Sequence, residues 1–196
     1  MSHSPNSRVP ILPVCLGVAL LVATSAASAQ ATGNAPNSNT TSSMQSAAKV
    51  SSSDKSFVEE AAIGGMAEVQ MGKLAQQKGG SHQVKQFGTR MVDDHSKVND
   101  DLKQVADSKG ITLPSELNSE HKNKVAKLER LSGPQFDRAY MDGMVSAHKK
   151  DIAEFQKQAK SAHDPDIKGF ASKELPTLQE HLTLAESTDK AVKSGK

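Results

Sequence analysis

Apolar and small side chains recur with helical periodicity along four long segments of the chain. In each segment they return every three or four residues, which is typical of a helix that buries one face. The first segment begins near Asp54, a candidate N-cap, and stops at Gly79-Gly80, and the second covers about residues 81–108. The third covers about residues 134–162, and the fourth opens with Asp164-Pro165, a capping residue followed by proline. The pattern predicts an all-α fold.

The connection between the second and third segments differs from the other two. Those two are only a few residues long, whereas residues 111–133 contain a Leu-Pro-Ser sequence and then a shorter helical stretch at about 118–131. Short, long, short is the connectivity of a bundle whose second and third helices run parallel and are joined by a crossover. The sequence therefore predicts a four-helix bundle over residues 54–190, with a helix-containing crossover and a tail at 191–196.

A short internal echo indicates two related halves. Val84-Lys85-Gln86-Phe87, at the start of the second helical segment, resembles Ile167-Lys168-Gly169-Phe170 at the start of the fourth. Self-similarity of this kind is the sequence signature of a repeated structural unit. It suggests that the bundle consists of two related helical hairpins.

Residues 1–29 have the pattern of a cleaved secretory signal. Arg8 precedes an apolar run at residues 11–23, and Ala27-Ser28-Ala29 forms the small-residue end. The run is shorter than the roughly 20 residues of a spanning helix, and it contains Cys15, the only cysteine. Residues 30–53 are rich in Ser, Thr, Asn and Ala, which is typical of a flexible spacer. We expect an exported protein of the periplasm or outer membrane whose mature chain lacks disulfides and a transmembrane segment.

Charge and aromatic content bear on the partners of the mature chain. The 24 Lys and Arg residues nearly balance the 22 Asp and Glu residues, and only 3% of residues are aromatic, with no Trp. This composition gives no electrostatic or stacking basis for binding nucleic acid. The sequence identifies no other partner, and it leaves open both association with the envelope and self-association.

Polar residues occupy the middle of the apolar face on each long helix. Four of them, one on each helix, fall at about the same height when ~1.5 Å is allowed per residue and the second and third helices are parallel. These four are Glu68, His95, His148 and His181. Asp151 and Glu174 also face inward, about one turn lower. Buried carboxylates and imidazoles are costly unless each has a partner.

Three interpretations of this layer stay open. It could be a hydrogen-bonded polar layer that fixes helix register. It could hold a single transition metal, Zn, Cu, Fe or Mn, because imidazole and carboxylate ligands on facing helices suit these ions. Met91 and Met144 each precede a histidine by one turn, so sulfur and imidazole nitrogen could instead share Cu(I). Asp94, at the edge of its helix, could bond an imidazole. The other histidines of the mature chain are expected to be exposed: His82, His121 and His163.

The sequence also resembles an exported family catalogued as domain of unknown function 4142, whose members are often labelled outer-membrane proteins. The resemblance covers about residues 56–185 and implies a ferritin-like four-helix bundle and export, with no established activity. The residues that carry it are Ala67-Glu68, Met91-Val92-Asp93-Asp94-His95, Gly133-Pro134-Gln135-Phe136-Asp137, Tyr140, Met144-Val145 with His148, and Leu175-Pro176 with His181.

The chain departs from catalytic ferritin-like proteins at three positions. Those proteins place Glu-x-x-His on two helices to hold two metals. Here Val92, Val145 and Leu178 stand three residues before the histidines. The di-iron constellation is therefore not reproduced, and we do not expect oxidase or iron-storage chemistry. The sequence identifies no catalytic residue, and the cofactor stays unknown apart from the single transition metal named above. The expected function is a non-enzymatic stress or interaction role in the envelope, and the alternative is metal binding by the layer of one glutamate and three histidines.

Overall fold

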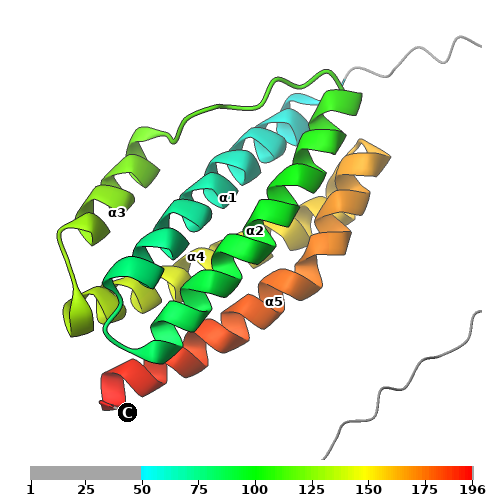
Figure 1. Ribbon diagram of the computed structural model, residues 1–196. Coiled ribbons are helices and arrows are strands. Elements are labelled where there is room, and N and C mark those ends of the chain that lie inside the picture. The colour runs from blue at the N-terminus through cyan, green and yellow to red at the C-terminus, as the bar shows by residue number, and fades with distance from the viewer. Residues whose placement is uncertain (1–49, 196) are drawn as a thin grey trace, which may run out of the picture. The chain divides into compact units, whose positions relative to one another are not determined.

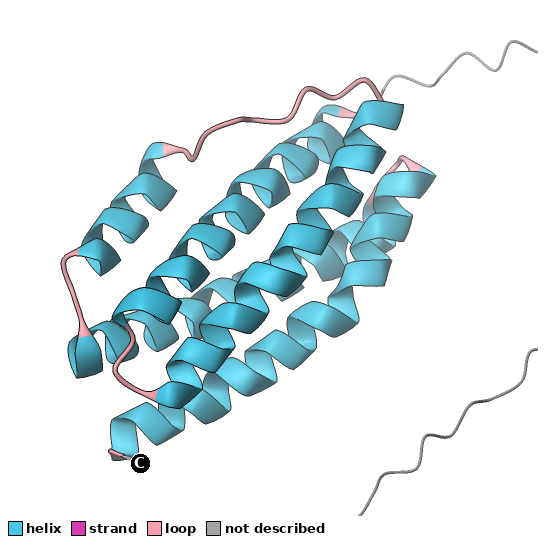
Figure 2. Cartoon of the chain, viewed as in Figure 1, coloured by secondary structure: helices cyan, strands magenta, loops and turns pink. Residues whose placement is uncertain are grey.

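The computed structural model describes residues 50–195. The predicted signal at residues 1–29, the spacer up to residue 49 and Lys196 lie outside the described residues. The helices are α1 (Ser52–Lys78), α2 (His82–Ser108), α3 (Ser119–Glu129), α4 (Gly133–Ser161) and α5 (Pro165–Ser194) (Figure 1). Within residues 50–195 the remaining segments are loops and turns, without a strand (Figure 2). The predicted all-α class is confirmed.

The long helices form two antiparallel hairpins. α1 packs along α2, α4 packs along α5, and the hairpins meet through α2 with α5 and α1 with α4. The crossover carries the chain back along the bundle, with α3 lying beside α1, so that α2 and α4 run parallel (Figure 1). A backbone bridge between Gly79 and Gly133 joins the α1–α2 turn to the start of α4. The fold is a ferritin-like four-helix bundle with the long, helix-containing crossover that the sequence predicts.

The first and last helices of the bundle begin and end at other residues than the sequence predicts. α1 is capped by Ser51 rather than Asp54, and the Ser51 hydroxyl accepts a hydrogen bond from the backbone N–H of Asp54. α5 continues past residue 190 to Ser194, because Val192 packs against the core. Gly195, with φ 72°, ends it in the left-handed conformation that glycine adopts most readily. None of the helices in residues 50–195 has a stretch apolar enough to cross a membrane.

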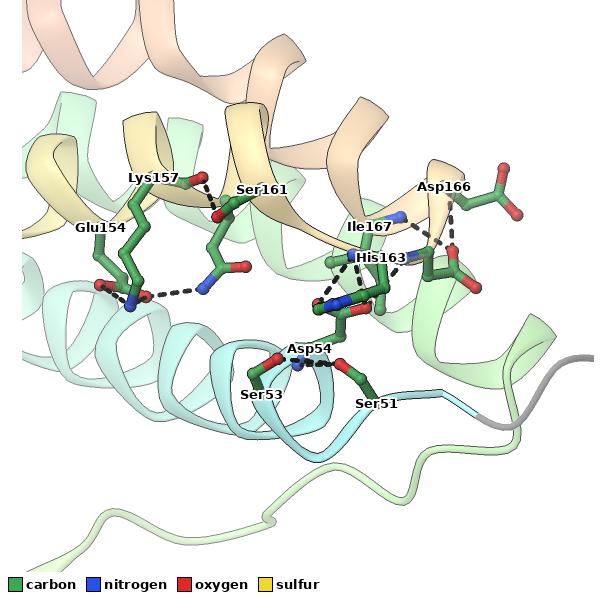
Figure 3. Close-up of polar contacts among 11 residues, drawn as sticks. Ser51, Ser53, Asp54, Glu154, Lys157, Ser161, His163, Asp166 and Ile167 are labelled. Atoms are coloured by element: carbon green, nitrogen blue, oxygen red, sulfur yellow. Dashed lines mark hydrogen bonds and ion pairs between the residues drawn. The ribbon is translucent and has the colours of Figure 1, made fainter.

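Asp54 is buried because it caps a turn distant in sequence. Its carboxylate accepts hydrogen bonds from the backbone N–H of His163 at 3.1 Å and of Asp164 at 2.9 Å, both in the α4–α5 turn (Figure 3). An ionised acceptor of backbone N–H groups makes a stronger bond than a neutral one. The first helix of one hairpin therefore holds the turn of the other.

Asp137 on α4 repeats this arrangement at the other end of the bundle. Its two carboxylate oxygens accept from the backbone N–H groups of Gly80 and Ser81 in the α1–α2 turn, each at 2.8 Å. The two hairpins thus cap each other reciprocally. This equivalence agrees with the sequence echo at the starts of the second and fourth long helices.

The core divides into two apolar clusters. One lies toward the α1–α2 turn and includes Met91, Phe136 and Met144. The other lies toward the α4–α5 turn and includes Leu102 and Phe170. On α2, α4 and α5 a buried histidine separates the two clusters. The bundle therefore has a polar level between two apolar ones, and the candidate site lies there.

Candidate metal centre

Three histidines meet at the polar level of the core. His95 comes from α2, His148 from α4 and His181 from α5, and their exposed fractions are 3%, 0% and 0%. The centroids of the three rings lie 5.1–5.8 Å apart. His95 and His148 meet because α2 and α4 are parallel and place these histidines at similar distances from the end where both helices start. The predicted shared height is confirmed for these three side chains.

Two of the rings have one nitrogen fixed by an acceptor outside the triad. Nδ1 of His148 donates to the main-chain carbonyl of Met144 at 3.0 Å. Nε2 of His181 donates to Oδ2 of Asp94 at 3.0 Å, which confirms the expected bond from Asp94 to an imidazole. Because the proton of each neutral ring is on the nitrogen that donates this hydrogen bond, the other nitrogen keeps its lone pair.

Glu68 on α1 lies behind the triad. Its Oε2 is 3.0 Å from Nδ1 of His95, and its Oε1 is 3.6 Å from Nδ1 of His148. Glu68 is buried, and burial raises the pKa of its carboxyl. The contact with Nδ1 leaves Nε2 of His95 facing away from the carboxylate. Glu68 is therefore placed to orient the ring of His95, as carboxylates do around metal-ligating histidines.

The remaining ring nitrogens have no partner in residues 50–195. Nε2 of His95, Nε2 of His148 and Nδ1 of His181 are all buried without a hydrogen bond. One nitrogen from each ring also lies within 4.8 Å of one nitrogen from each of the others. Because the partnered nitrogens face groups outside the triad, the unpartnered ones are those available to a shared ligand.

His95 and His181 are neutral at neutral pH. Burial, and then a charge on His148, lowers the pKa of His95 to about 3. Burial also lowers the pKa of His181 to about 4, although the hydrogen bond to Asp94 acts in the opposite direction. A neutral imidazole is the form that binds a metal, because its free nitrogen carries a lone pair. Neither His95 nor His181 therefore has to lose a proton before it can bind a cation.

The other predicted inward carboxylates lie in different surroundings. Asp151 lines a cavity between α1, α3 and α4 together with Glu68. Burial, and then the charge of Glu68, raises the pKa of Asp151 to about 7. Glu174 is buried on α5 and lies 3.6 Å from Nζ of Lys173. Asp151 and Glu174 are therefore not part of the converging group. That group consists of the three histidines, and Glu68 lies beside it.

The remaining histidines are only partly as expected. His82 and His163 are exposed, which agrees with the sequence. His121 is half-buried on α3 and lines the same cavity as Asp151, so its predicted exposure is wrong. Its ring packs inward because α3 docks on α1 and α4, a contact that the periodicity of a short helix does not reveal.

Comparisons with known proteins agree with this architecture. No curated protein matches the chain. Among solved structures, the fold is similar to that of a DUF305 fragment from Deinococcus radiodurans, with a TM-score of 0.64 and 13% identity, over 72% of this chain and 97% of that one. At this identity the likeness concerns the fold alone. The sequence model described as domain of unknown function (DUF4142) matches residues 39–188, which is most of the chain. The chain therefore belongs to the DUF4142 family.

Proposed function

We propose that this protein binds a single transition-metal ion through His95, His148 and His181. The observation that carries the proposal is the convergence of three buried imidazoles, each with one nitrogen that lacks a hydrogen-bond partner. Leaving a buried polar atom unsatisfied costs about 1–3 kcal/mol. One ion bound to all three nitrogens would remove that cost at three atoms together.

A purely structural polar layer explains this arrangement less well. Layers that only fix helix register satisfy their own polar atoms, because a partly satisfied network is worse than an apolar core. Here Glu68, Asp94 and the Met144 carbonyl engage one nitrogen of each ring and leave the second one open. Partnering of the non-ligating nitrogen by a carboxylate or carbonyl is the usual arrangement around metal-bound histidines.

The donor set narrows the choice of ion. Three imidazoles, with the carboxylates of Glu68 and Asp94 behind two of them, suit zinc or copper better than the oxygen-seeking Mg, Ca or Mn. Bonds of about 2.0–2.1 Å to each nitrogen would bring the nitrogens to about 3.4 Å from one another. The rings therefore need to close slightly around the ion. Because the triad is buried, a bound ion would be enclosed, which favours metal holding over catalysis on a free substrate.

The proposal is tested by calorimetric titration of the metal-stripped mature chain with Zn(II), and with Cu(I) under reducing conditions. We expect one ion per chain, with binding lost in His148→Leu and in His181→Leu. His163→Leu is the matched control, because it removes an exposed histidine outside the triad. Equal binding by the wild type and both triad variants would overturn the proposal.

We further propose that the protein acts outside the cytoplasm. The support is the secretory-signal pattern of residues 1–29, with its small-residue end at Ala29. When the full chain is expressed in a Gram-negative host, osmotic shock should release the protein, and its first residue should be Gln30. Recovery only from the cytosol with residues 1–29 intact would contradict this localisation.

A further inference from the structure

A cavity of about 370 Å³ lies between α1, α3 and α4, beside the histidine triad. Its apolar lining includes Met71, Leu128 and Met144. A Cβ atom added at Gly64 or Gly143, two other lining residues, would meet no atom within 4 Å. No protein atom therefore fills the space beside these two glycines. The volume of the cavity falls within the roughly 300–1,000 Å³ of small-molecule sites.

Two buried polar atoms of the cavity lining lack partners within residues 50–195. Oε1 of Glu68 and the hydroxyl of Tyr140 make no hydrogen bond, although these side chains are only 5% and 0% exposed. Both groups are costly to bury unsatisfied. Glu68 accepts a hydrogen bond when ionised, and Tyr140 can donate or accept one. A ligand with a hydroxyl at its inner end would satisfy both.

More lysines than carboxylates stand at the mouth of the cavity. Lys124, Lys127 and Lys150 line it and are exposed, as is Glu120, whereas Asp151 lines it from a half-buried position. Lys124 pairs with Glu120 at 2.7 Å, whereas neither Lys127 nor Lys150 forms an ion pair with a residue in the range 50–195. Two lysines without a carboxylate partner favour an anionic group at the mouth.

We infer that this cavity binds a small aromatic acid whose ring carries a hydroxyl group. The hydroxyl would meet Glu68 and Tyr140, the ring would contact the apolar lining, and the carboxylate would lie near Lys127 and Lys150. Methionine sulfur makes favourable contacts with aromatic rings, which suits Met71 and Met144 in the lining. The inference does not depend on a bound metal.

Tyr140 is the only tyrosine in the chain, so it is a selective reporter. We expect 3-(4-hydroxyphenyl)propanoate to shift the single tyrosine signal of chain labelled with ¹³C-tyrosine, and to bind saturably by calorimetry. 3-Phenylpropanoate, which lacks the hydroxyl, and 4-ethylphenol, which lacks the carboxylate, should each bind at least tenfold more weakly.

Gly143→Leu fills the cavity and should abolish binding. Gly169→Leu is the matched control, because a Cβ there also meets nothing within 4 Å but Gly169 lies on α5, outside the cavity lining. Circular dichroism checks that both variants fold, and Tyr140→Phe, which keeps the ring and removes the hydroxyl, should bind the acid about tenfold more weakly. No binding of the hydroxyphenyl acid, equal binding of 3-phenylpropanoate, or unchanged binding by Gly143→Leu would each overturn the inference.

Discussion

Oδ2 of Asp94 lies 3.0 Å from Nε2 of His181, and this contact determines which nitrogen of the ring keeps its lone pair. Arg90 holds the same carboxylate at 3.1 Å and also bonds Glu180 at 2.7 Å. Although partial burial raises the pKa of Asp94, the hydrogen bonds from His181 and Arg90 bring it below its usual value. An ionised acceptor therefore stands behind His181 at neutral pH, and Nδ1 stays available for a metal.

Asp94→Asn should weaken metal binding without changing its stoichiometry. The substitution removes the charged acceptor that orients His181, and loss of such a partner typically costs 10–100-fold in metal affinity. Competition with a zinc chelator measures the change. Asp93→Asn is the control, because Asp93 is the exposed neighbour on the same helix. Equal affinities for the two variants would argue against an orienting role of Asp94.

His181→Leu should change how stability depends on pH in the metal-free protein. In the native state the pKa of His181 is about 4, below its ordinary value of 6.5, so between these values only the unfolded chain takes up the proton. Acidification then favours unfolding of the wild type, by about 2 kcal/mol from this residue at pH 5. The free energy of unfolding, measured with urea in the presence of a chelator, should fall between pH 7.5 and pH 5 by about 2 kcal/mol less for the variant than for wild type. If the difference in unfolding free energy between variant and wild type does not vary with pH, the lowered pKa of His181 is refuted.

Asp54→Ala should destabilise the bundle by about 2–3 kcal/mol. It leaves the backbone N–H groups of His163 and Asp164 without their charged acceptor. Asp137→Ala should cost a similar amount at the opposite end, and the two effects should add because the sites are independent. Urea unfolding measures both, with the exposed Asp100→Ala as the control. A loss no larger than that of the control would show that the reciprocal caps contribute little.

Two glycines of α1 should respond in opposite directions to alanine. A Cβ at Gly72 would lie 2.8 Å from the carbonyl oxygen of Gly88 on α2, so the helices must separate, at a cost of about 1–3 kcal/mol. A Cβ at Gly64 meets nothing within 4 Å, and alanine is favoured over glycine in a helix by about 1 kcal/mol. The melting temperature of Gly72→Ala should be lower than that of wild type, and the melting temperature of Gly64→Ala should be higher. A Gly72→Ala variant at least as stable as wild type would contradict the close α1–α2 contact, and a destabilised Gly64→Ala variant would contradict the open space at Gly64.

Much of the fold could be predicted because its signals are local. Apolar periodicity located the long helices, and the lengths of their connections predicted that α2 and α4 are parallel. With a fixed rise per residue, that topology was enough to place His95, His148 and His181 at one height. Asp94 was recognisable at the edge of its helix.

The rest depends on contacts that no local pattern contains. Whether Glu68 joins the ligands or stands behind them is set by side-chain torsions. The partner of His148 is a main-chain carbonyl, which carries no residue signature. The role of Asp54 arises from a turn more than a hundred residues away. The half-buried position of the His121 side chain results from the docking of α3 on α1 and α4.

The most direct test of the metal centre is X-ray absorption spectroscopy of the mature chain loaded with one equivalent of zinc. We expect three imidazole nitrogens at about 2.0–2.1 Å from the ion, and the loss of this signature in the variant that carries both His148→Leu and His181→Leu. A spectrum with fewer than three imidazoles, or one that is unchanged in the double variant, would contradict the assignment of His95, His148 and His181 as the ligands.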